Sequence, residues 1–133
     1  MADRPSHRFV LIVEDDDNIA AALEYVISRE GLDQDRVANG ADAMGRIRAL
    51  KPDLVLLDVM LPEVSGYEIC RTVRLDKTLG DVKILMMTAR GSVIERRKGM
   101  ALGADGFISK PFDLKELRNE VRRLLGAGAQ AGP

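Results

Sequence analysis

The sequence predicts an α/β fold in which a doubly wound, five-stranded parallel sheet is covered by helices on both faces. Short aliphatic runs alternate five times with amphipathic stretches of helical length. The runs are almost continuously apolar, which is typical of parallel strands that are buried on both faces. Because connections between parallel strands are right-handed, this alternation favours a doubly wound arrangement.

The composition is that of one globular domain with an aliphatic core. The chain has 133 residues, of which 46% are apolar, 31% are charged and 4% are aromatic. Its net charge of −1 disfavours a nucleic-acid-binding surface over the whole domain, so we expect no direct binding of nucleic acid. The single cysteine, Cys70, cannot form an internal disulfide, and no signal peptide or long apolar span is visible. We therefore expect a cytoplasmic protein that does not contact the membrane.

The first half of the chain is expected to contain two strands, each followed by a helix. Ile19, Leu23 and Ile27 recur at helical spacing after acidic residues that can cap a helix. Asn39 and Gly40 mark a turn before the second helix. The expected elements are a flexible arm over residues 1–7, a strand over 8–14, a helix that ends at Gly31, a strand over 34–38 and a helix that ends at Pro52.

The second half continues the alternation with three more strands and three more helices. Asp113, with Glu116 three residues later, is a helix-capping pattern, and Leu117 and Val121 lie on one face of the helix that follows. The other expected elements are strands over 53–58, 82–88 and 106–109 and helices over 65–75 and about 92–102. The domain is thus expected to span residues 8–125, with a flexible tail or linker stub over 126–133.

Polar residues end four of the expected strands. Glu14 and Asp15 end the first, Asp58 ends the third, Thr88 ends the fourth and Lys110 ends the fifth. In a doubly wound sheet, ligands bind beyond the carboxyl ends of the strands, where the strand order switches. We therefore expect these five residues to meet at one edge of the sheet.

The chemistry of this group points to a metal ion and a phosphoryl group. Carboxylates that meet in a cleft repel one another, since two charges ~4 Å apart interact by ~4 kcal/mol at an effective dielectric constant of ~20. Lys110 can offset one charge, and Mg²⁺, which prefers oxygen ligands, can offset the rest. No cysteine or histidine is placed to act as a nucleophile. An aspartate can attack phosphorus, and Asp58 is the best candidate because it ends the central strand alone.

Several segments resemble the receiver domain of bacterial response regulators. They read VLIVEDD, LVLLDVMLPEVSGYE, ILMMTAR and GADGFISKPF, and they follow one another in the same order as in that family. The resemblance covers roughly residues 8–125. It implies a flavodoxin-like (βα)₅ fold with strand order 2-1-3-4-5. It also implies a phosphoacceptor in a two-component phosphorelay, which catalyses only its own phosphorylation and dephosphorylation and is otherwise not an enzyme.

The resemblance assigns a role to each residue of the site. Asp58 would accept a phosphoryl group from a phosphohistidine on a sensor histidine kinase or a histidine phosphotransfer protein. The family's Mg²⁺ ligands correspond to Asp15, Asp58, the backbone carbonyl of Met60 and, through water, Glu14. Lys110 and Thr88 would contact the phosphoryl oxygens.

The resemblance also implies a switch. Thr88 would move toward the phosphate and Phe107 would fill the vacated space. The face formed by the helix 92–102, the strand 106–109 and the last helix would then change for a downstream effector or a tethered output domain. Met60 and Arg90 lie at positions that tune the phosphate lifetime, and we expect both side chains to obstruct water and give a lifetime of minutes or longer.

Two other functions remain open from the sequence. A haloacid-dehalogenase-like phosphatase also uses a strand-end aspartate with Mg²⁺, and Asp15-x-Asp17 superficially fits its first motif. The third hypothesis is a silent receiver used only for binding. Gly106 and Glu120 lie where an aspartate and an arginine pair in the dimers of related DNA-binding regulators, so the usual dimer is in doubt. This departure and the short tail favour a single-domain receiver, although an excised fragment would have the same sequence.

Overall fold

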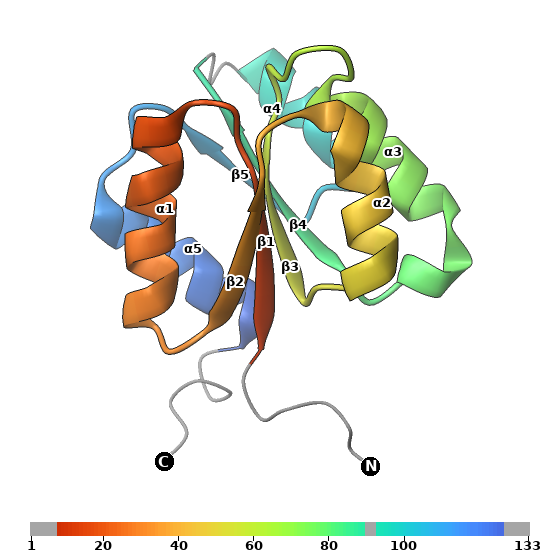
Figure 1. Ribbon diagram of the computed structural model, residues 1–133. Helices are drawn as coiled ribbons and strands as arrows, with labels where there is room; N and C mark the ends of the chain where they lie inside the picture. Colours follow the sequence, from red (N-terminus) through yellow and green to blue (C-terminus); the bar gives the residue numbers. More distant parts are fainter. Residues whose placement is uncertain (1–7, 90–92, 127–133) are drawn as a thin grey trace.

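The computed structural model describes residues 8–89 and 93–126 of the chain. Its strands form one parallel sheet in the order β2-β1-β3-β4-β5, which confirms the expected topology (Figure 1). The strands are β1 (Phe9–Val13), β2 (Asp33–Val37), β3 (Leu54–Asp58), β4 (Lys83–Thr88) and β5 (Gly106–Ser109). The helices are α1 (Asp17–Arg29), α2 (Gly40–Leu50), α3 (Gly66–Leu75), α4 (Val93–Ala101) and α5 (Leu114–Leu125). A short 3₁₀ helix, η1 (Lys77–Leu79), lies between α3 and β4 and was not predicted.

The observed strand bounds differ from the expected ones by at most one residue, and those of β5 agree at both ends. The strand expected over 34–38 lies at Asp33–Val37, because β2 pairs with β1 along its whole length, from Phe9 beside Asp33 to Val13 beside Val37. Residues 1–7 and 127–133 lie outside the described residues, so the structure does not test the expected arm or tail. In the part of the chain that the structure covers, no helix combines the length and apolar character that a membrane crossing requires.

Side chains cap the start of α1, α2, α3 and α5. The Asp16 carboxylate accepts hydrogen bonds from the backbone N–H groups of Asn18 and Ile19, at 2.8 and 3.0 Å. Ser65 and Asp113 cap α3 and α5 in the same way. These bonds satisfy N–H groups that the first turn of a helix leaves without a partner. The acidic run after β1 therefore serves in part as a helix start.

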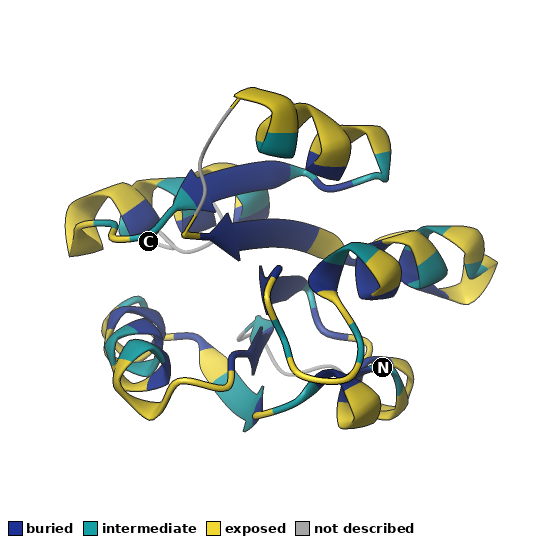
Figure 2. Cartoon of the chain, turned by 90° about the horizontal axis from the view of Figure 1, so that it is seen from above, coloured by how far each residue is buried: buried dark blue, intermediate teal, exposed yellow. Residues whose placement is uncertain are grey.

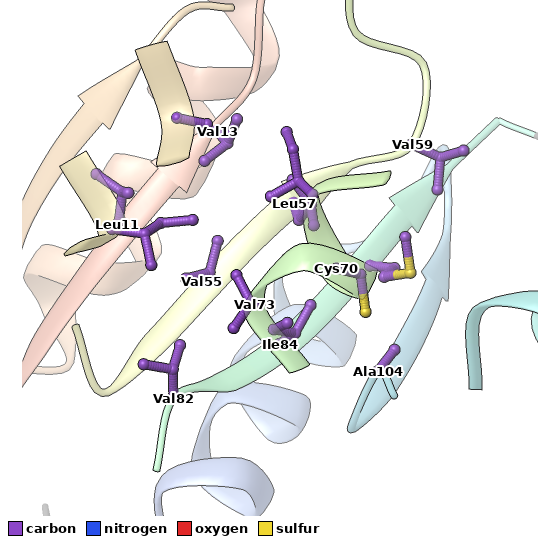
Figure 3. Close-up of a cluster of buried hydrophobic side chains, with 14 of the residues drawn as sticks. Leu11, Val13, Val55, Leu57, Val59, Cys70, Val73, Val82, Ile84 and Ala104 are labelled. Carbon is purple, nitrogen blue, oxygen red and sulfur yellow. The ribbon is translucent and has the colours of Figure 1, made fainter. Parts of the chain in front are cut away.

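The core has two layers, one on each face of the sheet, and the strands between them are largely buried, apart from the edge strand β2 (Figure 2). Helices α1 and α5 cover one face, and α2, α3 and α4 cover the other (Figure 1). Successive residues of a strand point to opposite faces. In β3, Leu54 and Leu56 belong to the layer beneath α1 and α5, whereas Val55 and Leu57 belong to the other layer (Figure 3). This burial on both faces explains the continuous apolar runs in the sequence.

Helix α4 packs more weakly than the other helices. Gly99 is its buried residue, and a Cβ added there would lie 3.1 Å from the Met86 sulfur and from the Phe107 ring. Val93 and Ile94 are 64% and 76% exposed. The helix therefore rests closely on β4 and β5 at a glycine and leaves apolar side chains in solvent.

Polar and aromatic contacts attach α4 to its neighbours. The Tyr67 hydroxyl on α3 donates a hydrogen bond to the Glu95 carboxylate on α4. Lys98 Nζ lies 4.4 Å from the centre of the Tyr67 ring, and Arg96 Cζ lies 5.7 Å from the centre of the Phe107 ring. The charged run on α4 thus contacts two aromatic rings as well as solvent.

Candidate functional site

Three carboxylates meet at the carboxyl edge of the sheet, as the sequence predicted. Glu14 and Asp15 follow β1, and Asp58 ends the neighbouring strand β3. One carboxylate oxygen from each of these residues lies within 4.8 Å of the others. Glu14 and Asp58 are buried, whereas Asp15 is exposed. We call these three residues the acidic rim.

Lys110 neutralises part of the charge of the acidic rim. Its Nζ donates a hydrogen bond to Glu14 Oε1 at 2.9 Å and lies 3.3 Å from Asp58 Oδ1. Burial raises the pKa of Glu14, although the hydrogen bond from Lys110 opposes that rise. Burial opposes the charge of Lys110, but the hydrogen bond to Glu14 and the charges of Asp58 and Glu14 raise the pKa of Lys110. The lysine is therefore an ammonium held between two carboxylates.

The close approach of α3 to β3 encloses Asp58. Asp58 is 3% exposed, and its Oδ1 accepts a hydrogen bond from the backbone N–H of Met60 at 3.1 Å. Gly66, the first residue of α3, lies so near that an added Cβ would come within 2.3 Å of the Asp58 carbonyl oxygen. The glycine that follows the proline-containing loop is thus needed to bring α3 against the end of β3.

Glu14 is held at every polar atom. Its backbone N–H donates to the Val37 carbonyl at 3.1 Å, and its Oε2 accepts from the backbone N–H of Asp16 at 3.1 Å. Its carbonyl oxygen accepts two hydrogen bonds from Arg36, from Nε at 3.0 Å and from Nη2 at 2.8 Å. Arg36 could not be predicted from the sequence, because an arginine on a polar strand carries no motif and its contact depends on the register of β2 beside β1.

Thr88 and Phe107 lie on the next two strands, Thr88 at the end of β4 and Phe107 two residues before the level of Thr88 in β5. Thr88 ends β4 at 1% exposure, and the Lys110 backbone N–H donates to its carbonyl at 2.7 Å. Phe107 in β5 is 4% exposed and faces the layer beneath α4. Arg90, the other residue expected to affect the phosphate lifetime, lies outside the described residues. The structure thus brings Glu14, Asp15, Asp58, Met60, Thr88 and Lys110 to one edge of the sheet, whereas Phe107 lies further back in β5.

The donor set fits a hard divalent cation. All three groups of the acidic rim offer carboxylate oxygens, the ligands that Mg²⁺ prefers, and they carry more negative charge than one lysine can offset. Asp15 faces solvent, which leaves one side open for water ligands. The rim can therefore hold an ion that keeps part of its water shell.

Comparison with known proteins identifies the family. The sequence matches the response regulator receiver domain over residues 10–122. The chain belongs to this family. Receiver domains are modules of two-component signalling, so the first of the three hypotheses drawn from the sequence gives the correct class of protein.

Curated and solved relatives agree with this assignment. The phosphate regulon transcriptional regulatory protein PhoB of Rhizobium meliloti is 40% identical over 116 residues, which cover 87% of this chain and 51% of PhoB. A crystal structure from Chloroflexus aurantiacus, assigned as a response regulator, has a TM-score of 0.85 at 36% identity and covers 90% of this chain and 98% of that chain. The chain spans about half the length of the curated relatives it matches.

A third relative bears on the metal. The receiver domain of a sensor histidine kinase from Pseudomonas aeruginosa PAO1 was solved with a magnesium ion coordinated in its active site cleft. It has a TM-score of 0.82 at 27% identity and covers 90% of this chain and 98% of that chain.

An apolar groove adjoins the rim of this receiver domain. It has a volume of about 460 Å³ and lies between α1 and the segment that joins β5 to α5. Lys110, which contacts Glu14 and Asp58, is one of the residues that line the groove, so the groove adjoins the acidic rim. Its apolar lining is formed by Ile19, Ala22, Ala89, Pro111, Phe112 and Leu114.

Proposed function

We propose that this receiver domain accepts a phosphoryl group on Asp58 and thereby switches its α4–β5–α5 face. The observation that carries the proposal is the position of Asp58, which ends the central strand with Lys110 Nζ 3.3 Å away and two further carboxylates beside it. A carboxylate so placed can act as a nucleophile, while a cation beside it stabilises the charge that develops on a transferring phosphoryl group.

The transfer step takes its phosphoryl group from a phosphorylated donor. A carboxylate oxygen of Asp58 forms a bond to phosphorus, and the phosphorus–nitrogen bond of the donor phosphohistidine breaks. The bonding electron pair leaves with the imidazole nitrogen, and the unphosphorylated histidine of the donor is regenerated. Lys110 then pairs with one phosphoryl oxygen, and Thr88 donates a hydrogen bond to another.

Magnesium is the cofactor that the acidic rim would hold. Asp15, Asp58 and the Met60 carbonyl would be its protein ligands, with Glu14 acting through water, because Glu14 Oε1 already accepts from Lys110. When bound, the ion would neutralise the rim and lower the cost of bringing a phosphoryl group to it. The magnesium ion reported in the Pseudomonas receiver supports this proposal.

A sensor histidine kinase or a histidine phosphotransfer protein would be the donor. The apolar groove beside Lys110 supports this proposal, since a helix of the donor seated there would place its phosphohistidine near Asp58. The receiver unit would cover residues 8–125. The product would act on a downstream effector or on a tethered output domain, as the name of the transcriptional relative PhoB suggests for that protein.

Thr88, Phe107 and α4 would transmit the signal. Thr88 and Phe107 are buried residues of the neighbouring strands β4 and β5. Gly99 of α4 packs against the Phe107 ring. Moving a two-state equilibrium from about 1:99 to about 99:1 takes about 5.5 kcal/mol. A single charge-assisted hydrogen bond contributes about 1.5–3 kcal/mol, so a partner or a second copy of the chain must complete the shift.

The lifetime of the phosphate would depend on Met60. Met60 is 62% exposed, and its backbone N–H donates a hydrogen bond to Asp58 Oδ1. There it can obstruct water that attacks the acyl phosphate, with Arg90 as the second residue proposed to do so. We expect loss of phosphate over minutes or longer, and a time course completed within seconds would contradict this.

Incubation with acetyl phosphate and Mg²⁺ tests the function. We expect intact-protein mass spectrometry to show one added phosphoryl group on the wild type and on Asp81→Asn, and none on Asp58→Asn. Asp81 is exposed, so its variant controls for the loss of one carboxylate. Turnover of phosphate esters that depends on Asp15 would favour the phosphatase instead, and no modification of the wild type would favour the silent receiver.

A further inference from the structure

We propose that Arg36 is a positioning residue for the metal site, because it holds the Glu14–Asp17 turn in the shape that presents Asp15 beside Asp58. The inference rests on the proposed binding of Mg²⁺ and adds a residue of β2 to that site. Arg36 lies on the far side of β1 from Asp58, so it would act through Glu14 and Asp17 rather than by touching the ion.

The guanidinium of Arg36 joins both ends of this turn. Nε and Nη2 donate to the Glu14 carbonyl oxygen at 3.0 and 2.8 Å. Nη1 lies 2.9 Å from Asp17 Oδ1 at the start of α1. The side chain of Arg36 is 23% exposed and that of Asp17 is 90% exposed, so the bonds to the Glu14 carbonyl are the partly shielded ones and the ion pair with Asp17 lies in solvent. One rigid side chain therefore fixes the two residues that flank the loop carrying Asp15.

Asp15 needs such support more than the other two carboxylates. Glu14 and Asp58 are buried and are held by Lys110, whereas Asp15 is exposed. The carbonyl that Arg36 binds belongs to the peptide group between Glu14 and Asp15. The orientation of this peptide sets the direction in which the Asp15 side chain leaves the backbone.

The planar guanidinium group of an arginine can contact both Glu14 and Asp17, whereas the ammonium group of a lysine cannot. Arginine presents several N–H donors in a fixed plane, so it can bind a carbonyl twice and a carboxylate at the same time. A lysine would deliver the same charge from a single flexible point. Exchanging Arg36 for lysine therefore separates geometry from charge.

If Arg36 acted only through its charge, its removal would change the affinity for Mg²⁺ in the opposite direction from the loss of a positioning role. A cation near the acidic rim repels Mg²⁺, so its removal would tighten metal binding if Arg36 acted only through its charge. If Arg36 holds the turn, its removal loosens Asp15 and weakens binding. Residues that orient metal ligands typically contribute 10–100-fold to metal affinity. The sign of the change therefore decides between the two roles.

Calorimetric titration of the full chain with Mg²⁺ tests the proposal. We expect Arg36→Gln and Arg36→Lys each to bind Mg²⁺ roughly 10-fold more weakly than the wild type. Arg46 provides control variants, because it is an arginine that forms an ion pair with Asp35, the residue before Arg36 in β2. Arg46→Gln should bind Mg²⁺ at least as tightly as the wild type, and Arg46→Lys should leave the affinity unchanged.

Urea unfolding of each variant shows whether the fold is intact. If Arg36→Gln fails to fold, the comparison of Arg36→Lys with Arg46→Lys still decides the question. Unchanged or tighter binding by Arg36→Gln, or full affinity in Arg36→Lys, would overturn the positioning role while leaving the proposed function standing. A wild type that binds no Mg²⁺ would instead overturn the metal part of the proposed function and, with it, the role of Arg36.

Discussion

At the scale of single residues, two carboxylates of the acidic rim are buried and the third is exposed. Glu14 is completely buried, yet each of its polar atoms has a protein partner. Buried charges are tolerated when they are paired and hydrogen-bonded in this way. Asp15, the exposed member of the acidic rim, is the group left most open to an ion from solvent.

The residues of the rim could be predicted from the sequence, whereas their supports could not. Asp58 and Lys110 each end an apolar run, and the parallel sheet brings such ends together whatever the details of packing. Arg36 acts across the β1–β2 register, and Tyr67 reaches Glu95 across two helices. Contacts of this kind depend on rotamers and helix positions that a single sequence does not reveal.

Tyr67 offers a test at this scale. Burial and the hydrogen bond to Glu95 raise the pKa of Tyr67 to about 12 from an ordinary value near 10. Its contribution to stability is therefore complete below pH 10 and is lost as the pH rises toward 12, because the unfolded chain ionises first. We expect the phenolate absorbance of the Tyr25→Phe variant, in which Tyr67 is the remaining tyrosine, to rise with a midpoint near pH 12.

Glu95→Gln in the same background is the comparison. Removing the carboxylate takes away its charge and the hydrogen bond that it accepts, so the midpoint should fall. An identical midpoint with and without Glu95 would show that α4 does not sit against Tyr67 in solution.

At the scale of the elements, burial decides what a sequence reveals. β1, β3 and β4 are covered on both faces, and their aliphatic runs predict them to within a residue. β2 is an edge strand in which Val37 is the buried residue, so its polar sequence left the bounds shifted by one. η1 was missed because three residues of 3₁₀ helix leave no periodicity to detect.

Gly66→Ala and Gly45→Ala form a matched pair of variants. The new Cβ at Gly66 would meet the Asp58 carbonyl oxygen and the Val59 Cα, so we expect a loss of about 1–3 kcal/mol or more in the free energy of unfolding. At Gly45, inside α2, nothing lies within 4 Å of the new Cβ, and the better helix former should add about 0.5–1 kcal/mol. Urea unfolding measures both changes.

The same pair reports on the site. Gly66→Ala would push α3 away from the end of β3, so its phosphorylation by acetyl phosphate should slow, whereas Gly45→Ala should react like the wild type. Wild-type stability in Gly66→Ala would contradict the close approach of α3 to β3.

At the scale of the whole molecule, repulsion among the carboxylates of the acidic rim is expected to lower the free energy of unfolding when no Mg²⁺ is bound. Replacing Asp15 with asparagine removes a carboxylate that repels Glu14 and Asp58, and charges about 4 Å apart interact by about 1 kcal/mol in water. We expect Asp15→Asn to be more stable than the wild type by about 1 kcal/mol without Mg²⁺, and Asp81→Asn to show no such gain.

Adding Mg²⁺ should reverse this order. A ligand at 100 times its dissociation constant adds about 2.7 kcal/mol to the free energy of unfolding. The wild type and Asp81→Asn should gain this stability in thermal unfolding, and Asp15→Asn should not. An equal gain in Asp15→Asn would remove Asp15 from the metal site.

The contact between Lys110 and Glu14 joins residues that are 96 positions apart. During synthesis, the acids therefore leave the ribosome long before the ammonium that restrains them. A nascent chain that stops short of β5 has its carboxylates but lacks the group that holds them in a reactive arrangement. Translation must therefore pass Lys110 before Glu14 and Asp58 can gain the ammonium group that lies between them.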